Sequence, residues 1–227
     1  TATEKEKLVE MDAMAIVDFE TTGWSPTKGA CPTEVAAVVL EDGRIAKRYQ
    51  SLINPGIPIP YKITCLTGIS NAMVRDAPPV AEVMREVADF VGDLPLVAHN
   101  ASFDSRFWDS GLASIHRTRQ QEFACTMMAA KRVYPTAGKY SLANLAAFTH
   151  LQSNGKAHRA MADVRMVVRL LRHMEETLAE QFQIPSLSHD LLCAIQQASR
   201  IDIQTCIRQF YACNVGSKKP LKANLLW

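Results

Sequence analysis

The sequence predicts an α/β or α+β domain built on a mixed β-sheet. Apolar, β-prone runs separated by turn residues dominate the first part of the chain. Amphipathic helical patterns follow, and they alternate with a further short apolar run. Strands that precede helices, and helices that then alternate with strands, indicate a sheet with helices packed against it.

Three strands are expected near the N-terminus. The run at residues 14–20 is apolar and β-prone, and residues 34–40 are rich in Val and Ala. An Asp-Gly pair at 42–43 is a hairpin turn signal that leads into a third strand at 44–53. The Pro-rich stretch 54–60 is expected to close this meander.

Helices are expected on both sides of a further strand. Residues 80–91 place apolar side chains on one helical face, and residues 94–98 form the next strand. A helix then starts near Ser102, which is the candidate N-cap. Another helical stretch begins at Ser141, and residues 159–182 form a long helix.

At 227 residues the chain suits one domain with an appendage. We expect a flexible N-terminus at residues 1–12 and a folded domain at 13–183. The Ile-Pro-Ser run at 184–186 is the best boundary, and residues 187–211 predict one or two short helices. Residues 184–227 are therefore expected to form a small helical C-terminal extension that ends in a basic tail.

The composition is that of an ordinary folded protein, with 48% hydrophobic and 21% charged residues. The net charge of +2 gives no global attraction for nucleic acid, so a phosphate-binding surface must be local. No apolar run approaches the ~20 residues of a membrane span, which predicts no membrane partner. The six cysteines are scattered without a Cys-x-x-Cys pair, which favours reduced thiols and a cytoplasmic location.

An acid pair ends the first apolar run, in the segment Met-Ala-Ile-Val-Asp-Phe-Glu at 14–20. Asp18 and Glu20 stand two residues apart, so both carboxylates leave one face of a strand. Converging carboxylates are costly unless water or a cation neutralises them, and Mg²⁺ prefers oxygen ligands. The pair therefore predicts half of a metal site. The alternative is an acid pair on the solvent face of an edge strand.

Two more acids and a histidine lie at other predicted elements. Asp104 follows the strand at 94–98, where a helix-start acid is an equally good explanation. Asp163 stands beside the apolar stripe of the long helix. His158 precedes Asp163 by five residues, which rotate ~500° along a helix, so both face one site only if His158 lies in the loop ahead of the helix. Histidine titrates near neutral pH and suits a general base.

Three segments occur together in the order of a known family. They are Asp-Phe-Glu-Thr-Thr-Gly at 18–23, Val-Ala-His-Asn-Ala-Ser-Phe-Asp at 97–104 and His-Arg-Ala-Met-Ala-Asp at 158–163. They resemble the three exonuclease motifs of the DEDD superfamily, in its histidine-containing (DEDDh) branch. This branch includes the epsilon proofreading subunit of bacterial replicases, ribonuclease T and exonuclease X. The likeness covers roughly residues 13–180.

The resemblance implies a ribonuclease-H-like fold with a mixed five-stranded sheet, and 3′-to-5′ removal of nucleoside monophosphates. It further implies that four carboxylates hold two divalent cations, Mg²⁺ or Mn²⁺, and that a histidine acts as general base in a two-metal mechanism. The four metal-binding acids are Asp18, Glu20, Asp104 and Asp163, and the base is His158.

The resemblance also implies contacts to a nucleic acid 3′ end. The candidate substrate-binding residues are Thr21, Thr22, Thr67, Ile69, His99, Asn100 and Phe103. Thr67 and Ile69 belong to a segment similar to one that wedges against terminal bases in the family, although Thr67 replaces the usual histidine. Phe103 is equally well explained as a core residue, and His99 as a residue that orients its neighbours.

The leading hypothesis is a metal-dependent 3′–5′ exonuclease that acts on DNA, with single-stranded ends preferred. The alternatives are a ribonuclease-T-like enzyme that trims RNA 3′ ends, and a non-catalytic polymerase-associated or end-binding module. The module predicts a lost acid or histidine, and none is lost. The C-terminal extension is expected to contact a polymerase or a second copy of the chain. A zinc-bound interaction module is a further alternative there, although the spacing matches no established zinc pattern. Its ligands would be His189, Cys193, Cys206 and Cys213.

Overall fold

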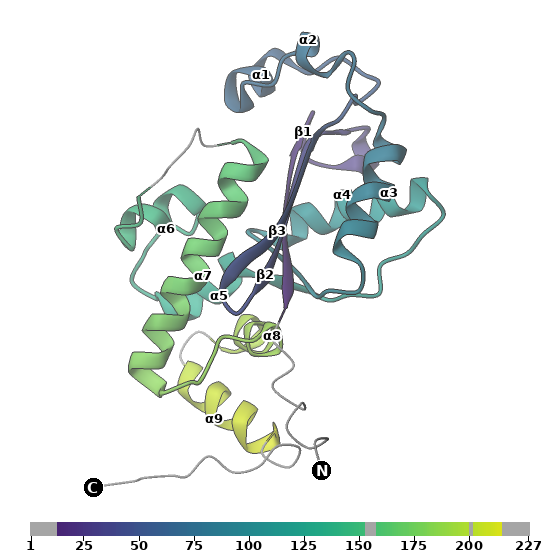
Figure 1. The fold of residues 1–227 in the computed structure, drawn as a ribbon. Helices are drawn as coiled ribbons and strands as arrows, with labels where there is room; N and C mark the ends of the chain where they lie inside the picture. The colour runs from purple at the N-terminus through teal and green to yellow at the C-terminus, as the bar shows by residue number, and fades with distance from the viewer. Residues whose placement is uncertain (1–12, 153–157, 200–201, 215–227) are drawn as a thin grey trace, which may run out of the picture.

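The computed structural model describes residues 13–152, 158–199 and 202–214, and this part of the chain contains a five-stranded sheet (Figure 1). The strands lie in the order β3-β2-β1-β4-β5. β1 pairs antiparallel with β2 and parallel with β4, so the predicted mixed five-stranded sheet is confirmed. The strands are β1 (Met14–Thr21), β2 (Pro32–Glu41), β3 (Arg44–Leu52), β4 (Leu96–Ala98) and β5 (Phe123–Cys125).

The hairpin between β2 and β3 has the turn that its sequence predicts. Asp42 and Gly43 both adopt positive φ angles, 48° and 67°. A two-residue turn of this kind matches the right-handed twist of the flanking strands. The hairpin places Glu34 at the β2 end that lies next to the end of β1, since Glu34 is the register partner of Glu20.

Helices cover both faces of the sheet (Figure 1). On one face lie α3 (Val80–Val91) and α4 (Ala101–Ser114). On the other lie α5 (Thr126–Val133), α6 (Leu142–Phe148) and α7 (Ala160–Phe182).

Strand β1 contributes to both cores by alternation. Ala15, Val17 and Phe19 pack in the core that contains α3 and α4, whereas Met14 and Ile16 pack in the core that contains α7. Because side chains alternate along a strand, the residues two and four positions after Ile16 also face α7. These residues are the acid pair, Asp18 and Glu20.

A segment with two short helices was not expected from the sequence. After the Pro-rich stretch come α1 (Tyr61–Thr67) and α2 (Asn71–Val74). They lie at the end of the molecule opposite α8 and α9 (Figure 1). Ile59, Ile69 and Val74 form a small core of their own there.

The start of α4 corrects one expectation. The N-cap is Asn100, in the left-handed conformation at φ 63°, and the helix begins at Ala101. Ser102 is already inside the first turn, where its Oγ donates to Asn100 Oδ1 at 3.3 Å. The chain must turn sharply after β4 ends at Ala98, and asparagine tolerates the left-handed conformation that this turn needs.

The short helices predicted beyond residue 184 are present as α8 (His189–Gln197) and α9 (Ile203–Asn214). Ile184, Leu191 and Ile195 belong to the same core cluster as the inner face of α7. The first part of the extension therefore shares the core of the main domain, while the boundary at 183/184 stays a prediction. The predictions for residues 1–12 and for the basic tail lie outside the described residues. Within the described ranges, no helix is both long and apolar enough to cross a membrane.

Candidate active site

The acid pair lies at the end of the central strand, on the face toward α7. Glu20 is buried and Asp18 is half-buried. Asp104 reaches the pair from the first turn of α4, where it is 1% exposed. The Phe19 backbone N–H, between the two acids, donates to Asp104 Oδ1 at 3.2 Å. The strand backbone thus brings the third acid to the first two.

Asp163 and His158 approach from the start of α7. Asp163 is in the first helical turn, and His158 precedes the helix in a left-handed conformation at φ 60°. The His158 backbone N–H donates to Asp163 Oδ2 at 3.1 Å. Ligand atoms of Glu20, His158 and Asp163 all lie within 4.8 Å of one another. His158 therefore lies ahead of the helix, as its spacing from Asp163 requires, and its side chain is exposed.

The electrostatics of the four acids fit a cation site. Burial, followed by repulsion from neighbouring carboxylates, holds the pKa of Asp18 well above its usual value and raises that of Glu20 to about 8. Burial also raises the pKa of Asp104 to about 8 and raises that of Asp163. Hard divalent cations prefer oxygen ligands, and a cation bound here would favour the ionised form of these carboxylates. The donor set therefore fits divalent metal ions.

Thr21 and Thr22 are buried and hold the turn after β1. Thr21 Oγ1 donates to Gly23 O at 2.6 Å, and Thr22 Oγ1 accepts from Cys31 N at 3.0 Å. Their hydroxyl groups thus stabilise the turn in this structure. Contacts with a nucleic acid 3′ end by these two residues stay a prediction, as does a contact by the half-buried Asn100.

His99 is held by the protein on both ring nitrogens. Nε2 lies 2.9 Å from Tyr140 O, and Nδ1 lies 2.9 Å from Thr126 Oγ1. Because a carbonyl only accepts, Nε2 carries the hydrogen and Nδ1 accepts from the Thr126 hydroxyl. Burial lowers the pKa of His99 to about 4, so the ring is neutral at pH 7. This geometry supports the orienting role rather than a phosphate contact.

Thr67 and Ile69, which belong to the segment that resembles a wedge against terminal bases, are both buried. Ile69 is fully buried beside Ile59 and Val74. Thr67 is 1% exposed, and its Oγ1 donates to Ile63 O and accepts from Ile69 N. Neither side chain offers a surface to a nucleotide in this conformation, because both stabilise the α1–α2 segment. The large apolar side chains exposed on this segment are Tyr61, Leu66 and Met73.

Trp24 is a candidate substrate contact that the sequence argument missed. It is 81% exposed, one residue after the Thr-Thr-Gly turn. Its ring packs edge-on against Phe103 at 6.3 Å, and Phe103 packs against the buried Phe107 at 5.0 Å. Phe103 thus links the core to an exposed aromatic surface. The available signal was the position of a tryptophan directly beside the first motif.

Glu34 and Arg159 are a second omission. Glu34 is buried opposite Glu20 and forms an ion pair with Arg159, the residue after His158. An acid inside the apolar run 34–40 was the available signal, because unpaired acids are almost never fully buried.

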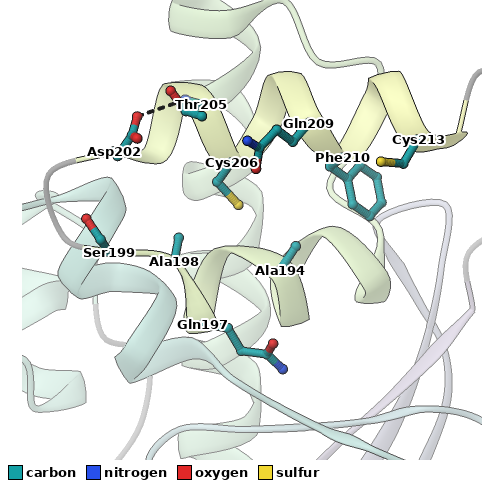
Figure 2. A pocket seen from close by; sticks show the side chains of 10 residues that line it. All are labelled: Ala194, Gln197, Ala198, Ser199, Asp202, Thr205, Cys206, Gln209, Phe210 and Cys213. Atoms are coloured by element: carbon teal, nitrogen blue, oxygen red, sulfur yellow. Dashed lines mark hydrogen bonds between the residues drawn. The ribbon is translucent and has the colours of Figure 1, made fainter.

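The zinc alternative has no support in the geometry. Across the described ranges, three candidate metal ligands come together at Glu20, His158 and Asp163, whereas the late His and Cys series forms no such group. His189 Nε2 instead forms a hydrogen bond with the backbone carbonyl of Leu96, at 3.1 Å. Cys206 and Cys213 lie along α9, above α8, and line a groove of about 500 Å³ between the two helices (Figure 2).

The chain matches known proteins over the region that forms this site. The family described as "Exonuclease" matches residues 15–171. The DNA polymerase III subunit epsilon of Aquifex aeolicus is 33% identical over 164 residues, or 72% of this chain and 80% of that protein. DNA polymerase III PolC-type of Clostridium perfringens is 35% identical over 195 residues, which cover 85% of this chain and only 13% of that protein.

A solved structure of exonuclease X in complex with 5′ overhanging duplex DNA is similar as a whole. The TM-score is 0.63 at 27% identity, over 81% of this chain and 99% of that chain. The matched region contains all three acid-bearing segments. This chain belongs to the exonuclease family.

Proposed function

We propose that the protein is a 3′–5′ exonuclease that releases nucleoside monophosphates from DNA, with single-stranded ends preferred. One observation carries the proposal. Four carboxylates from β1, α4 and α7 converge at one end of the sheet, and an exposed histidine stands at the same place. A non-catalytic module would not need to retain all five groups.

Members of this family use divalent metal ions, and we propose two Mg²⁺ or Mn²⁺ ions held by Asp18, Glu20, Asp104 and Asp163. When bound, such ions supply Lewis acidity toward the phosphodiester and lower the pKa of the attacking water. His158 is exposed and close to Glu20 and Asp163, so its ring is placed to accept a proton from that water.

The terminal nucleotide would lie between the turn after β1 and the start of α4. Trp24 and Phe103 offer an aromatic surface on which a base can stack, and stacking tolerates any base. The backbone at Thr21 and the Asn100 side chain would then contact the 3′ end. Recognition of this kind implies little sequence specificity.

Two relatives support DNA and a polymerase as partners. The exonuclease X structure contains duplex DNA with a 5′ overhang, and the epsilon protein is a subunit of DNA polymerase III. The chain spans 13% of the PolC-type relative, so association with a polymerase is a proposal about this domain alone. We place that contact, or a contact with a second copy, on the extension beyond residue 184.

The test uses 5′-labelled substrates: single-stranded DNA, duplex DNA with recessed or overhanging ends, and RNA of the same sequence. Stepwise shortening from the 3′ end is expected with Mg²⁺ or Mn²⁺, fastest on single-stranded DNA, and none with chelator. Asp104→Asn is expected to reduce kcat by ~10³-fold or more, because it removes a buried ligand group of the metal site. Faster shortening of RNA would favour the RNA-trimming alternative.

The matched control is Asp109→Asn on the same helix. Asp109 is exposed and pairs with Arg119 outside the acid cluster, so this variant is expected to keep wild-type kcat. The two-metal assignment would be contradicted if the DNA were still shortened in the presence of chelator, or if Asp104→Asn kept the wild-type kcat.

A further inference from the structure

Glu34 is a fifth carboxylate beside the four acids, and it is buried. It is the register partner of Glu20 in the antiparallel pair of β1 and β2, and its side chain is 1% exposed. Like charges directly opposite one another destabilise a sheet. A fifth carboxylate therefore adds to the repulsion at the site unless a positive group compensates it.

Arg159 provides this compensation through a two-point ion pair. Its Nη2 donates to Glu34 Oε1 at 2.8 Å, and its Nε donates to Oε2 at 3.1 Å. Gln50 Nε2 donates to Oε1 at 2.9 Å, and the Ala160 N–H donates to Oε2 at 3.1 Å. Each oxygen of Glu34 thus accepts two hydrogen bonds, which fills its capacity. Glu34 is committed to the protein rather than to a cation.

The same bonds fix the start of α7. Arg159 is the N-cap residue, but its side chain makes no capping hydrogen bond. Glu34 on β2 instead accepts from Ala160, the first residue of the helix, and so caps the helix from the neighbouring strand. His158 directly precedes this anchor, and Asp163 lies one helical turn after it. The position of both residues relative to Glu20 therefore depends on the anchor.

We propose that the Glu34–Arg159 ion pair is a positioning device that holds His158 and Asp163 against β1 before any cation binds. This inference rests on the proposed function and gives neither residue a contact with substrate. Substituting a residue that orients metal ligands without binding the metal itself typically lowers metal affinity or activity by ~10–100-fold. Breaking the pair should therefore weaken cation binding and leave the affinity for DNA unchanged.

The experiment compares Arg159→Gln, Arg159→Lys and Arg119→Gln. Arg119 is the matched control, because it makes a two-point pair with Asp109, at 2.8 and 3.1 Å, outside the acid cluster. Mn²⁺ binding is followed without substrate, as the thermal shift at increasing Mn²⁺ concentration. Separately, kcat and KM for single-stranded DNA are measured over the same Mn²⁺ range.

Arg159→Gln is expected to raise the Mn²⁺ midpoint of both titrations by ~10-fold or more, and to leave KM for DNA unchanged at saturating Mn²⁺. Arg159→Lys should restore part of the loss, because lysine keeps the charge but not the two-point geometry. Arg119→Gln should keep the wild-type midpoint. Should Arg159→Gln not fold, Gln50→Ala removes one donor to Glu34 and is expected to shift the midpoint in the same direction by a smaller factor.

Two results would overturn the proposal. One is a Mn²⁺ midpoint that stays at the wild-type value in Arg159→Gln, or in Gln50→Ala where that variant is the one measured. The other is a raised KM for DNA with an unchanged midpoint, which would make Arg159 a substrate contact. Because Mn²⁺ binding is measured without substrate, a wild-type protein that binds Mn²⁺ but shortens no polymer would refute the proposed function and leave this test readable.

Discussion

Trp24 is the exposed end of a series of aromatic contacts that starts in the core. The distances between ring centroids are 6.5 Å from Phe19 to Phe107, 5.0 Å from Phe107 to Phe103 and 6.3 Å from Phe103 to Trp24. The buried members hold Phe103 in place, and Phe103 supports one edge of the indole. Trp24 is therefore a positioned surface rather than a free side chain, even though most of it is exposed.

This support leads to a prediction for substrate binding. Stacking of one base contributes ~1–3 kcal/mol, so Trp24→Ala should raise KM for single-stranded DNA by about 10-fold and change kcat less. Trp24→Phe should keep most of the affinity. Steady-state kinetics on a labelled oligonucleotide measure both.

The control for this prediction is Phe148→Ala, which removes another exposed aromatic ring, on α6. An equal rise in KM for both variants would show a general effect of lost aromatic surface. An unchanged KM in Trp24→Ala would remove Trp24 from the substrate site.

At the scale of elements, α8 protects the edge of the sheet. β5 is an outer strand, and the Gln196 side chain satisfies its backbone: Oε1 accepts from Cys125 N at 2.7 Å, and Nε2 donates to Phe123 O at 3.3 Å. An amide side chain offers both a donor NH₂ group and an acceptor oxygen, so it can pair with a strand as another strand would. His189 adds a bond to Leu96 O on β4.

Gln196→Ala is accordingly expected to destabilise the protein by ~1–3 kcal/mol, because it leaves strand groups without partners. For a domain of this size, 1 kcal/mol corresponds to a fall of ~2–4 °C in Tm. Calorimetry measures the change, and the Mn²⁺ midpoint should not move. The neighbouring Gln197 is exposed, so Gln197→Ala should keep the wild-type Tm. Equal Tm values for the two variants would contradict the role of α8 at this edge.

The elements that could be predicted are those with a long or well-marked pattern. β1, β2, β3, α3 and α7 have enough residues for a period to emerge, and the Asp-Gly turn marks the hairpin. β5 has three residues, which are too few to show alternation, and the Pro-rich stretch concealed the two short helices that follow it.

The roles of single residues could likewise be predicted where the local sequence carries a marked pattern. The five catalytic candidates stand in local motifs, so their convergence could be expected before the fold was known. The role of His99 depends on Thr126 and Tyr140, which are 27 and 41 residues away. Arg159 meets Glu34 across 125 residues. The partner residues in contacts of this range follow from the topology. An acid in an apolar run indicates that a partner is needed, but not which residue it is.

At the scale of the whole molecule, the acids link stability to pH and to cations. Unfolded carboxyl groups have pKa values near 4, whereas burial raises those of Glu20 and Asp104 to about 8 in the folded protein. Repulsion from neighbouring carboxylates adds to the shift of the Glu20 pKa. The folded state thus binds protons more tightly than the unfolded chain. By linkage, the contribution of these acids to stability is lost as pH rises from about 4 to about 8.

We therefore expect the cation-free protein to lose stability across this range, and Mn²⁺ to raise Tm more at pH 8 than at pH 5. Glu20→Gln removes one buried charge, so it should raise Tm at pH 8 in the presence of chelator, by ~2–4 °C for each 1 kcal/mol. Glu82→Gln, at an exposed position on α3, should leave Tm unchanged. A Glu20→Gln protein that is less stable than wild type at pH 8 without cations would contradict this account.

The alternation of side chains along β1 limits where this fold can tolerate insertions and deletions. Its even-numbered residues face α7 and carry the acids, while its odd-numbered residues fill the core beneath α3 and α4. One residue inserted between Ile16 and Asp18 would exchange the two sets, so that carboxylates entered the hydrocarbon core and Phe19 took their place at the active site. The solvent-exposed connection at Asp42 has no such constraint. Insertions and deletions should thus be absent from β1 among functional variants and accumulate in surface turns.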